Sequence, residues 1–354
     1  MDANPLALLA VFAGSLLAST LLVPIAGMCG RRLGFVDRPR RGEVQELILP
    51  RTGGYGIFLA FAIGVAISLV LLPRYTDEYP RLWGLLLGSA LLVPLAILDD
   101  WKRLPPTPQL FWQIAAAGVP ILFGVTFDNL AGPFGSIVPL PGFLVLPATL
   151  LWIVGMVNTV NLTDTMDGLA GGVATIAALV LAGVSLQNGQ TSIAALSLAL
   201  AGATIGFLFY NFHPSRIIMG SSGSLFLGYA LGVLAIIGGA KIAAAVMVLG
   251  LPILDVAYVI ISRLRRGRSP LRGGDAAHLP HRLLALGLSQ RQVALVLYGV
   301  CLLFGLLALV LTKVEKLYGF LLLGLVALAL IWFAARRQDE ATIAHGSAPR
   351  DERP

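Results

Sequence analysis

Long apolar runs recur through almost the whole chain, and short polar segments separate them. A membrane-spanning helix needs about 20 apolar residues, and about eleven runs approach or reach that length. They cover 6–28, 53–72, 82–98, 109–126, 143–160, 168–186, 192–210, 223–238, 242–262, 291–312 and 318–335. Only 12% of the 354 residues are charged, whereas a soluble domain carries about 25%. The sequence therefore predicts an all-α, polytopic membrane protein with about eleven transmembrane helices.

The organisation predicted from these runs is simple. Residues 1–337 form one membrane domain, and the polar residues 338–354 form a disordered cytoplasmic tail. The first run lacks a basic start and a small-residue cleavage pattern, so we interpret it as a span and not as a signal peptide. Cys29 and Cys301 have neither disulfide nor metal-ligand spacing and are interpreted as small buried apolar residues.

The positive charge is a topology signal. The net charge of +7 could suggest a nucleic-acid partner, but most Lys and Arg fall in alternate loops, as the positive-inside rule requires. Residues 29–52 and 263–290 are the most basic of these loops. The sequence therefore predicts an external N-terminus, a cytoplasmic C-terminus and no nucleic-acid partner. The same basic residues would suit anionic lipid headgroups.

Polar residues that are unusual beside membrane spans fall at the same predicted cytoplasmic edge. They are Asp99, Asp100, Asn161, Asp164, Asp167, Asn211, His213, His278, His281 and Arg282. The orientation came from Lys and Arg alone, so this one-sidedness is independent of it. Carboxylate and amide oxygens suit Mg²⁺, which often shares its ligands with substrate phosphates, and Arg and His suit further phosphate oxygens. Together they predict a diphosphate site at the membrane surface.

Each element has a structural alternative when it is taken alone. The acidic pair could cap a helix, and NLTDTMDG could be a helix stop followed by a turn. The two histidines of HLPHR are a weak zinc signal without thiolates, and His213 before Pro214 reads as a turn residue. Asp255, within a predicted span, could carry protons or could simply hydrogen-bond between helices.

Several motifs occur together and in order. They are GFVDRP (34–39), PRTGG (50–54), LDDWKRLPP (98–106), VNLTDTMDGLAGG (160–172), YNFHP (210–214), IIMGSSGSLFLGY (217–229), PILDVAYVIISRLRRGRSP (252–270) and HLPHRLLALGLSQRQ (278–292). With this set, residues 10–335 resemble the polyprenyl-phosphate N-acetylhexosamine-1-phosphate transferases, and the last motif is more similar to the N-acetylglucosamine-1-phosphate branch.

The resemblance implies a reaction. A UDP-N-acetylhexosamine, in particular UDP-N-acetylglucosamine, gives its sugar-1-phosphate to undecaprenyl phosphate and releases UMP. This is the first membrane step of a cell-envelope glycan such as lipopolysaccharide or teichoic acid. The expected cofactor is Mg²⁺, with Mn²⁺ as the alternative, and the expected place is the cytoplasmic face of a bacterial plasma membrane. Members of the family can form homodimers, but nothing in the sequence identifies an interface.

The resemblance also implies roles for individual residues. Asp99 would be the base or the orienting group for the lipid phosphate, and Asp100 would help to hold the metal. Asp164 and Asp167 complete the expected catalytic set, and Asp167 is also an expected metal ligand. The expected substrate-binding residues are Arg51, Asn161, Asn211, His278, His281 and Arg282.

One departure from the family pattern bears on activity. The family motif Met-Gly-Asp-x-Gly-Ser reads Met219-Gly220-Ser221-Ser222-Gly223-Ser224 here. Ser221 thus stands at an expected metal-ligand position, and a hydroxyl is a poorer Mg²⁺ ligand than a carboxylate. Two alternatives therefore stay open: a catalytically impaired homologue that binds lipid phosphate or nucleotide-sugar, and a transporter. The transporter is disfavoured because its ionisable groups should lie near the midplane of the membrane.

Overall fold

The computed structural model describes residues 4–37, 48–131, 137–237, 241–267, 269, 278–311, 315 and 318–330. The predicted tail 338–354 and most of the first basic loop lie outside these residues. The helices are α1 (Pro5–Leu33), α2 (Gly53–Leu71), α3 (Glu78–Lys102), α4 (Pro106–Leu122), α5 (Gly142–Thr163), α6 (Leu169–Gln187), α7 (Thr191–Asn211), α8 (Gly220–Ile236), α9 (Ile242–Arg265), α10 (Leu279–Ala285), α11 (Gln290–Val310) and a last helix, Tyr318–Leu330.

Each predicted apolar run coincides with a helix. Within the described residues, eight helices are long and apolar enough to cross a membrane: α1, α2, α3, α5, α6, α7, α9 and α11. The helix α8 and the helix Tyr318–Leu330 are apolar but shorter, and α4 has 17 residues. A polytopic, essentially all-helical membrane protein is therefore confirmed, whereas the number eleven and the orientation stay predictions.

Three small elements had no counterpart in the sequence analysis. They are α10 and two antiparallel ribbons, which pair β1 (Val36–Asp37) with β2 (Leu49–Pro50) and β3 (Asn129–Ala131) with β4 (Ile137–Pro139). These segments are too short to leave a periodic pattern in the sequence. The first ribbon joins the ends of α1 and α2, and α10 lies between α9 and α11 in the chain.

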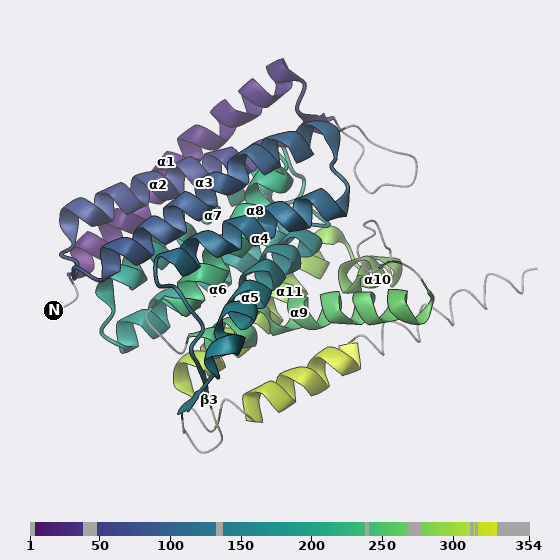
Figure 1. Cartoon of the computed structure of the whole chain (residues 1–354). Coiled ribbons are helices and arrows are strands. Elements are labelled where there is room, and N and C mark those ends of the chain that lie inside the picture. Colours follow the sequence, from purple (N-terminus) through teal and green to yellow (C-terminus); the bar gives the residue numbers. More distant parts are fainter. Residues whose placement is uncertain are drawn as a thin grey trace, which may run out of the picture.

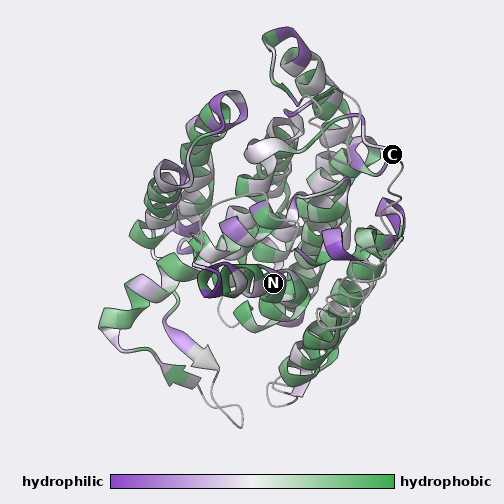
Figure 2. Cartoon of the chain, turned by 90° about the vertical axis from the view of Figure 1, so that its right-hand side faces the viewer, coloured by the Kyte–Doolittle hydropathy of each residue, from purple (hydrophilic) through white to green (hydrophobic). Residues whose placement is uncertain are grey.

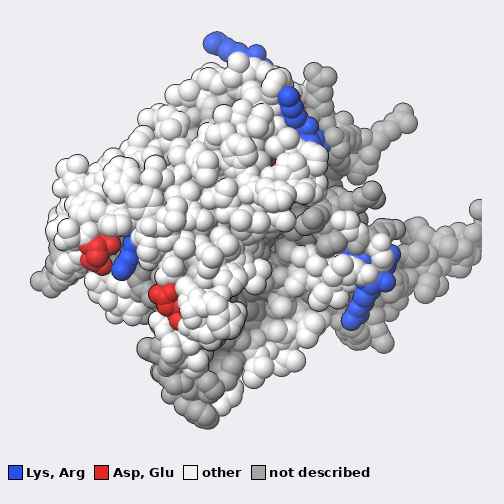
Figure 3. Space-filling model, viewed as in Figure 1, with Lys and Arg blue, Asp and Glu red and all other residues white. Residues whose placement is uncertain are grey.

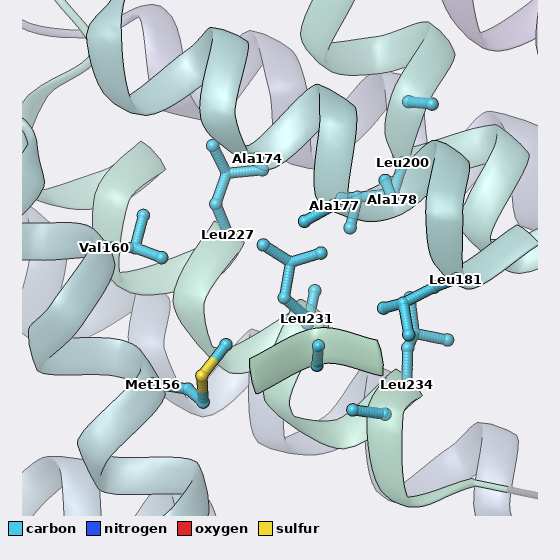
Figure 4. Close-up of a cluster of buried hydrophobic side chains, with 14 of the residues drawn as sticks. Met156, Val160, Ala174, Ala177, Ala178, Leu181, Leu200, Leu227, Leu231 and Leu234 are labelled. Carbon is cyan, nitrogen blue, oxygen red and sulfur yellow. The ribbon is translucent and has the colours of Figure 1, made fainter. Parts of the chain in front are cut away.

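The centre of the molecule is α8. Every residue of this helix is buried, and α2, α3, α5 and α6 all pack against it (Figure 1). Figure 4 shows Leu227, Leu231 and Leu234 of α8 in one buried cluster with Met156 of α5 and Ala174 and Leu181 of α6. A helix that is apolar all round belongs in such a position, covered on all sides by other helices.

Small residues let the helices approach α8 closely. A Cβ atom on Gly54 of α2 would lie 1.9 Å from the backbone nitrogen of Gly223, and a Cβ atom on Gly228 would lie 2.6 Å from the carbonyl oxygen of Met156. Only glycine allows the helix backbones to touch at these points. Small residues at helix contacts are the usual means of close packing in lipid.

The charged side chains are distributed unevenly. In Figure 3 most of the visible Lys and Arg side chains lie toward the top and right of the face shown, and most of the visible acidic side chains lie toward the left. Figure 2, which looks at the molecule from the right-hand side of Figure 1, shows hydrophobic helices with only short hydrophilic stretches. The basic end is the one that the charge rule predicts to be cytoplasmic.

Candidate active site

The acidic pair lies in the last turn of α3, where both carboxylates are buried. Asp99 accepts hydrogen bonds at Oδ1 from the backbone N–H of Leu104 at 2.8 Å and from Nε2 of Gln109 at 2.7 Å. The Ser221 hydroxyl donates to its other oxygen, Oδ2. Both oxygens of Asp99 are thus occupied by the protein itself, which fixes the direction of the carboxylate.

Asp100 points toward the beginning of α8 and of α2. Its Oδ1 accepts from the backbone N–H of Ser221 at 2.8 Å, and its Oδ2 lies 3.4 Å from the hydroxyl of Tyr55 and from the backbone nitrogen of Ser222. The Nε of Arg51 is 4.0 Å from Oδ1. Asp100 therefore links three segments that are far apart in the sequence.

Gly220 makes this contact between α3 and α8 possible. Its φ of +71° is left-handed, a conformation that glycine adopts at little cost. A Cβ atom here would lie 2.2 Å from the carbonyl oxygen of Arg51 and 3.0 Å from Oδ1 of Asp100. The chain before α8 also hydrogen-bonds to the start of α2, because the N–H of Gly54 donates to the carbonyl of Met219 at 2.9 Å.

Arg51 stands between two carboxylates. Its Nη1 is 3.6 Å from Oδ1 of Asp37, and the same Asp37 oxygen accepts a hydrogen bond from Arg103. The Nε of Arg51 is buried and has no hydrogen-bond partner among the described residues. A buried N–H group without an acceptor is costly, so this guanidinium has donor capacity left for an anion.

Asp164 follows the last residue of α5. Its carboxylate makes no hydrogen bond within the described part of the chain. Burial raises the pKa of Asp164 to about 7; Arg51 opposes this shift, and the charges of Asp100 and Asp167 add to it. A carboxylate close to two others, without a donor of its own, is a site where a cation is favoured.

Asn161 and Asp167 are fixed by polar contacts. Oδ1 of Asn161 accepts from the Ser224 hydroxyl at 2.8 Å. Oδ2 of Asp167 is 2.8 Å from Nδ1 of His213 and accepts from the N–H of Ser215 at 3.1 Å. His213 is therefore more than the turn residue that the sequence suggested.

Asn211 has a structural part in the same region. Its side chain accepts from the N–H of Gly168 at 3.0 Å and donates to the carbonyl of Ile217 at 3.0 Å. It thereby joins the start of α6 to the segment before α8. Because α5 ends at Thr163 and α6 begins at Leu169, the loop between them, and not one helix face, presents Asp164 and Asp167.

The histidine segment forms a second cluster. Nδ1 of His278 is 2.8 Å from Oδ2 of Asp255, and both side chains are buried. Arg282 is buried, with its guanidinium over the ring of Tyr258. Burial lowers the pKa of His281; nearby His278 lowers it further, and Asp255 opposes this. Of the two alternatives for Asp255, the inter-segment hydrogen bond is the one that this geometry displays.

A cavity extends between this cluster and the end of α5. Its lining includes Thr163, Asp255, Leu279 and Pro280, together with side chains of α6 and α11. Asp164 follows Thr163 directly in the chain, so the acidic loop continues from one wall residue of this cavity, and Asp255 of the second cluster is another. Tyr55, Gln109 and Asp37 were not predicted as partners of the site. Asp37 lies in the motif GFVDRP, whereas Tyr55 and Gln109 are single polar residues in helices and have no distinctive signal.

A metal site with three or more acidic, His or Cys ligands is not found among the described residues. Mg²⁺, however, commonly uses one or two carboxylates and takes its other ligands from water and substrate phosphate. Within the described residues, Asp164 makes no hydrogen bond and lies beside Asp100 and Asp167, and this donor set fits such a site. The hydroxyl of Ser221 donates to Asp99 but keeps its oxygen lone pairs, so Ser221 as a metal ligand stays a prediction.

Fold and site together describe a polytopic membrane protein with an oxygen-rich acidic site beside Arg and His. Comparison with known proteins agrees. Residues 82–239 match glycosyl transferase family 4. The chain is 36% identical over 317 residues to a probable undecaprenyl-phosphate N-acetylglucosaminyl 1-phosphate transferase of Bacillus subtilis, covering 88% of this chain and 87% of the relative.

Two further relatives show the breadth of the similarity. A decaprenyl-phosphate N-acetylglucosaminephosphotransferase of Mycobacterium tuberculosis is 32% identical over 305 residues, covering 77% of this chain and 74% of the relative. A phospho-N-acetylmuramoyl-pentapeptide-transferase of a Synechococcus strain is 33% identical over 258 residues, covering 66% and 70%. The chain belongs to glycosyl transferase family 4 and is a membrane-embedded phosphoglycosyl transferase.

Proposed function

We propose that this enzyme transfers N-acetylglucosamine-1-phosphate from UDP-N-acetylglucosamine to undecaprenyl phosphate, with release of UMP, at the cytoplasmic face of a bacterial plasma membrane. The observation that carries the proposal is the convergence of Asp100, Asp164 and Arg51 at the ends of helices distant in sequence. The relatives of Bacillus and Mycobacterium, whose names specify N-acetylglucosamine and a polyprenyl phosphate, support this choice of substrates.

Different residues would bind the acceptor phosphate and the donor diphosphate. The acceptor phosphate is already anionic, so in-line attack needs mainly positioning and charge neutralisation. Arg51 would donate a hydrogen bond to that phosphate from its Nε, which has no hydrogen-bond partner among the described residues. Asp99 has both oxygens engaged by Leu104, Gln109 and Ser221, which suits an orienting role better than that of a base.

The donor diphosphate needs cationic partners. Arg282 and the histidines of the second cluster would bind its oxygens. Asp164, with Asp100 or Asp167, would hold Mg²⁺, which neutralises charge on the diphosphate and on the leaving UMP. Asn161, held by Ser224, borders the same site.

The proposal is tested with purified protein, undecaprenyl phosphate, Mg²⁺ and a panel of radiolabelled UDP-sugars, with UMP release as the readout. UDP-N-acetylglucosamine should give UMP only when lipid phosphate and metal are both present. Asp164→Asn should reduce the rate at least a hundredfold, on the scale of a lost electrostatic contact in an active site. Asp77→Asn, which alters a carboxylate paired with Arg81 at the opposite end of α3, is the matched control.

Ser221 favours a second candidate, a homologue that binds without efficient turnover. Its hydroxyl stands at the expected metal-ligand position and donates a hydrogen bond to Asp99. Tight binding of UDP-N-acetylglucosamine with no UMP release in Mg²⁺ or Mn²⁺ would establish this second reading and exclude the first.

A further inference from the structure

The second cluster is built from two matched contacts between α9 and α10. On α9, Asp255 and Tyr258 are three residues apart, and His278 and Arg282 at α10 are four apart, so each pair shares one helix face. Asp255 meets His278, and Tyr258 meets Arg282. Neither Asp255 nor Tyr258 belongs to the set of residues to which we assigned substrate contact above.

The first contact fixes the imidazole. Oδ2 of Asp255 is 2.8 Å from Nδ1 of His278, and Oδ1 accepts from the backbone N–H of Leu279 at 2.8 Å. An ionised carboxylate only accepts, so Nδ1 carries the hydrogen. Nε2 of His278 then remains available to another partner, and the second hydrogen bond holds the start of α10 in place.

The second contact supports a buried cation. The guanidinium carbon of Arg282 lies 4.5 Å from the centroid of the Tyr258 ring, and the residue is only 5% exposed. Its Nε and Nη1 are buried and have no hydrogen-bond partner among the described residues. A ring face attracts a guanidinium but accepts none of its in-plane N–H groups. The arrangement stabilises the charge while leaving its donors unused.

These contacts have a common consequence. We propose that Asp255 and Tyr258 are positioning residues that hold His278 and Arg282 with free nitrogen atoms ready for a nucleoside diphosphate. Asp255 also lines a cavity whose wall includes Thr163, the last residue of α5, and Asp164 follows Thr163 in the chain. The inference rests on the proposed function for the identity of the anion.

UDP binding without any acceptor lipid separates this inference from catalysis. Tyr258→Leu removes the ring and should weaken UDP binding about tenfold, on the scale of a desolvated cation–π contact. Tyr258→Phe keeps the ring and should restore most of the affinity. Asp255→Asn should also weaken UDP binding, because a neutral amide holds the Nδ1–H of His278 less strongly than a carboxylate does.

The outcomes discriminate clearly. Equal UDP affinity in the wild type, Tyr258→Leu and Asp255→Asn overturns the inference, as does absence of UDP binding by the wild type. If Tyr258→Leu does not fold, Arg282→Lys serves instead, because it keeps a charge over the ring but loses the guanidinium fork, and unchanged affinity there also counts against the inference. Differential UDP binding without UMP release would leave the positioning role intact and remove only the proposed transfer reaction.

Discussion

At the residue scale, the site depends on how completely each carboxylate is occupied. Among the described residues, Asp99 accepts three hydrogen bonds from protein donors, Asp100 accepts from backbone N–H groups of α8, and Asp164 has no donor. Three carboxylates with nearly the same chemistry thus have different capacities for a ligand. Ser221 contributes to this difference, since its backbone N–H donates a hydrogen bond to Asp100 and its hydroxyl donates one to Asp99.

The variant Ser221→Asp tests whether a hydroxyl instead of a carboxylate at this position limits metal binding. With Mg²⁺ present, the rate of UMP release should rise, because a carboxylate is a better Mg²⁺ ligand than a hydroxyl. Without a divalent cation, the melting temperature should fall, because the change removes a buried hydrogen bond and adds like charge, at a cost of about 1–3 kcal/mol. Melting in EDTA and in Mg²⁺, with UMP release, measures both effects.

Ser221→Asn is the matched control for that experiment, because it has a similar shape without the charge. Mg²⁺ should raise the melting temperature of Ser221→Asp but not that of Ser221→Asn, and Ser221→Asn should show no gain in the rate of UMP release. If Ser221→Asp and Ser221→Asn turn over UDP-N-acetylglucosamine equally, a missing carboxylate at this position does not limit the reaction.

At the element scale, the contact between α2 and α8 aligns the start of both helices at the site. The N–H of Gly53 donates to the carbonyl of Ile218 at 3.1 Å, and Gly54 touches the backbone of Gly223. Arg51 and Tyr55 flank this contact and both approach Asp100. Separation of the two helices would therefore move two partners of one carboxylate.

Gly54→Ala is expected to destabilise the protein by about 1–3 kcal/mol, the usual cost of overpacking, and to lower the rate of UMP release. The added Cβ atom would meet backbone atoms of α8, which cannot rotate away. Gly118→Ala in α4 is the control, since nothing lies within 4 Å of its Cβ position, and helix propensity alone should stabilise it by up to about 1 kcal/mol. Equal melting temperatures for the two variants would contradict the close contact.

At the scale of the whole molecule, the acidic cluster gathers at one end of the helix bundle. The ends of α3, α5 and α7 meet the beginnings of α2, α6 and α8 there. An alternating path through a membrane produces this arrangement, because odd-numbered helices end on the side where even-numbered ones begin. The site therefore requires that all of these helix ends lie on the same side of the membrane.

Cysteine labelling tests the sidedness. In a Cys29→Ser, Cys301→Ser background, Lys102→Cys follows the acidic pair and Asn188→Cys lies at the far end of α6, and both positions are exposed. A membrane-impermeant maleimide should label Asn188→Cys in intact spheroplasts and Lys102→Cys only after permeabilisation. Labelling of both from outside, or of Lys102→Cys alone, would contradict the orientation predicted from the basic loops.

Sequence and structure contributed different parts of this description. The apolar runs located the helices and the polar edges located most of the site, since lipid tolerates carboxylates only at such edges or in protein-lined sites. Hydropathy could not show that α8 is central, because a buried face and a lipid-facing face are equally apolar. The loop that carries Asp164 and Asp167 was indicated, because the apolar runs stop at 160 and resume at 168 and NLTDTMDG could be a helix stop followed by a turn, and α5 does end at Thr163.

By itself the sequence determined a helical membrane protein, its family and the residues that crowd one edge, because composition and ordered motifs are local properties of the chain. Only the tertiary structure decided, within the part of the chain that it describes, which carboxylate keeps free oxygens and which arginine nitrogens lack acceptors. It also showed that Asp255 and Tyr258 contact the histidine segment. Hydrogen-bond occupancy depends on partners that are distant in the chain, as Ser221 and Asp99 are at 122 residues apart, and no local pattern records it.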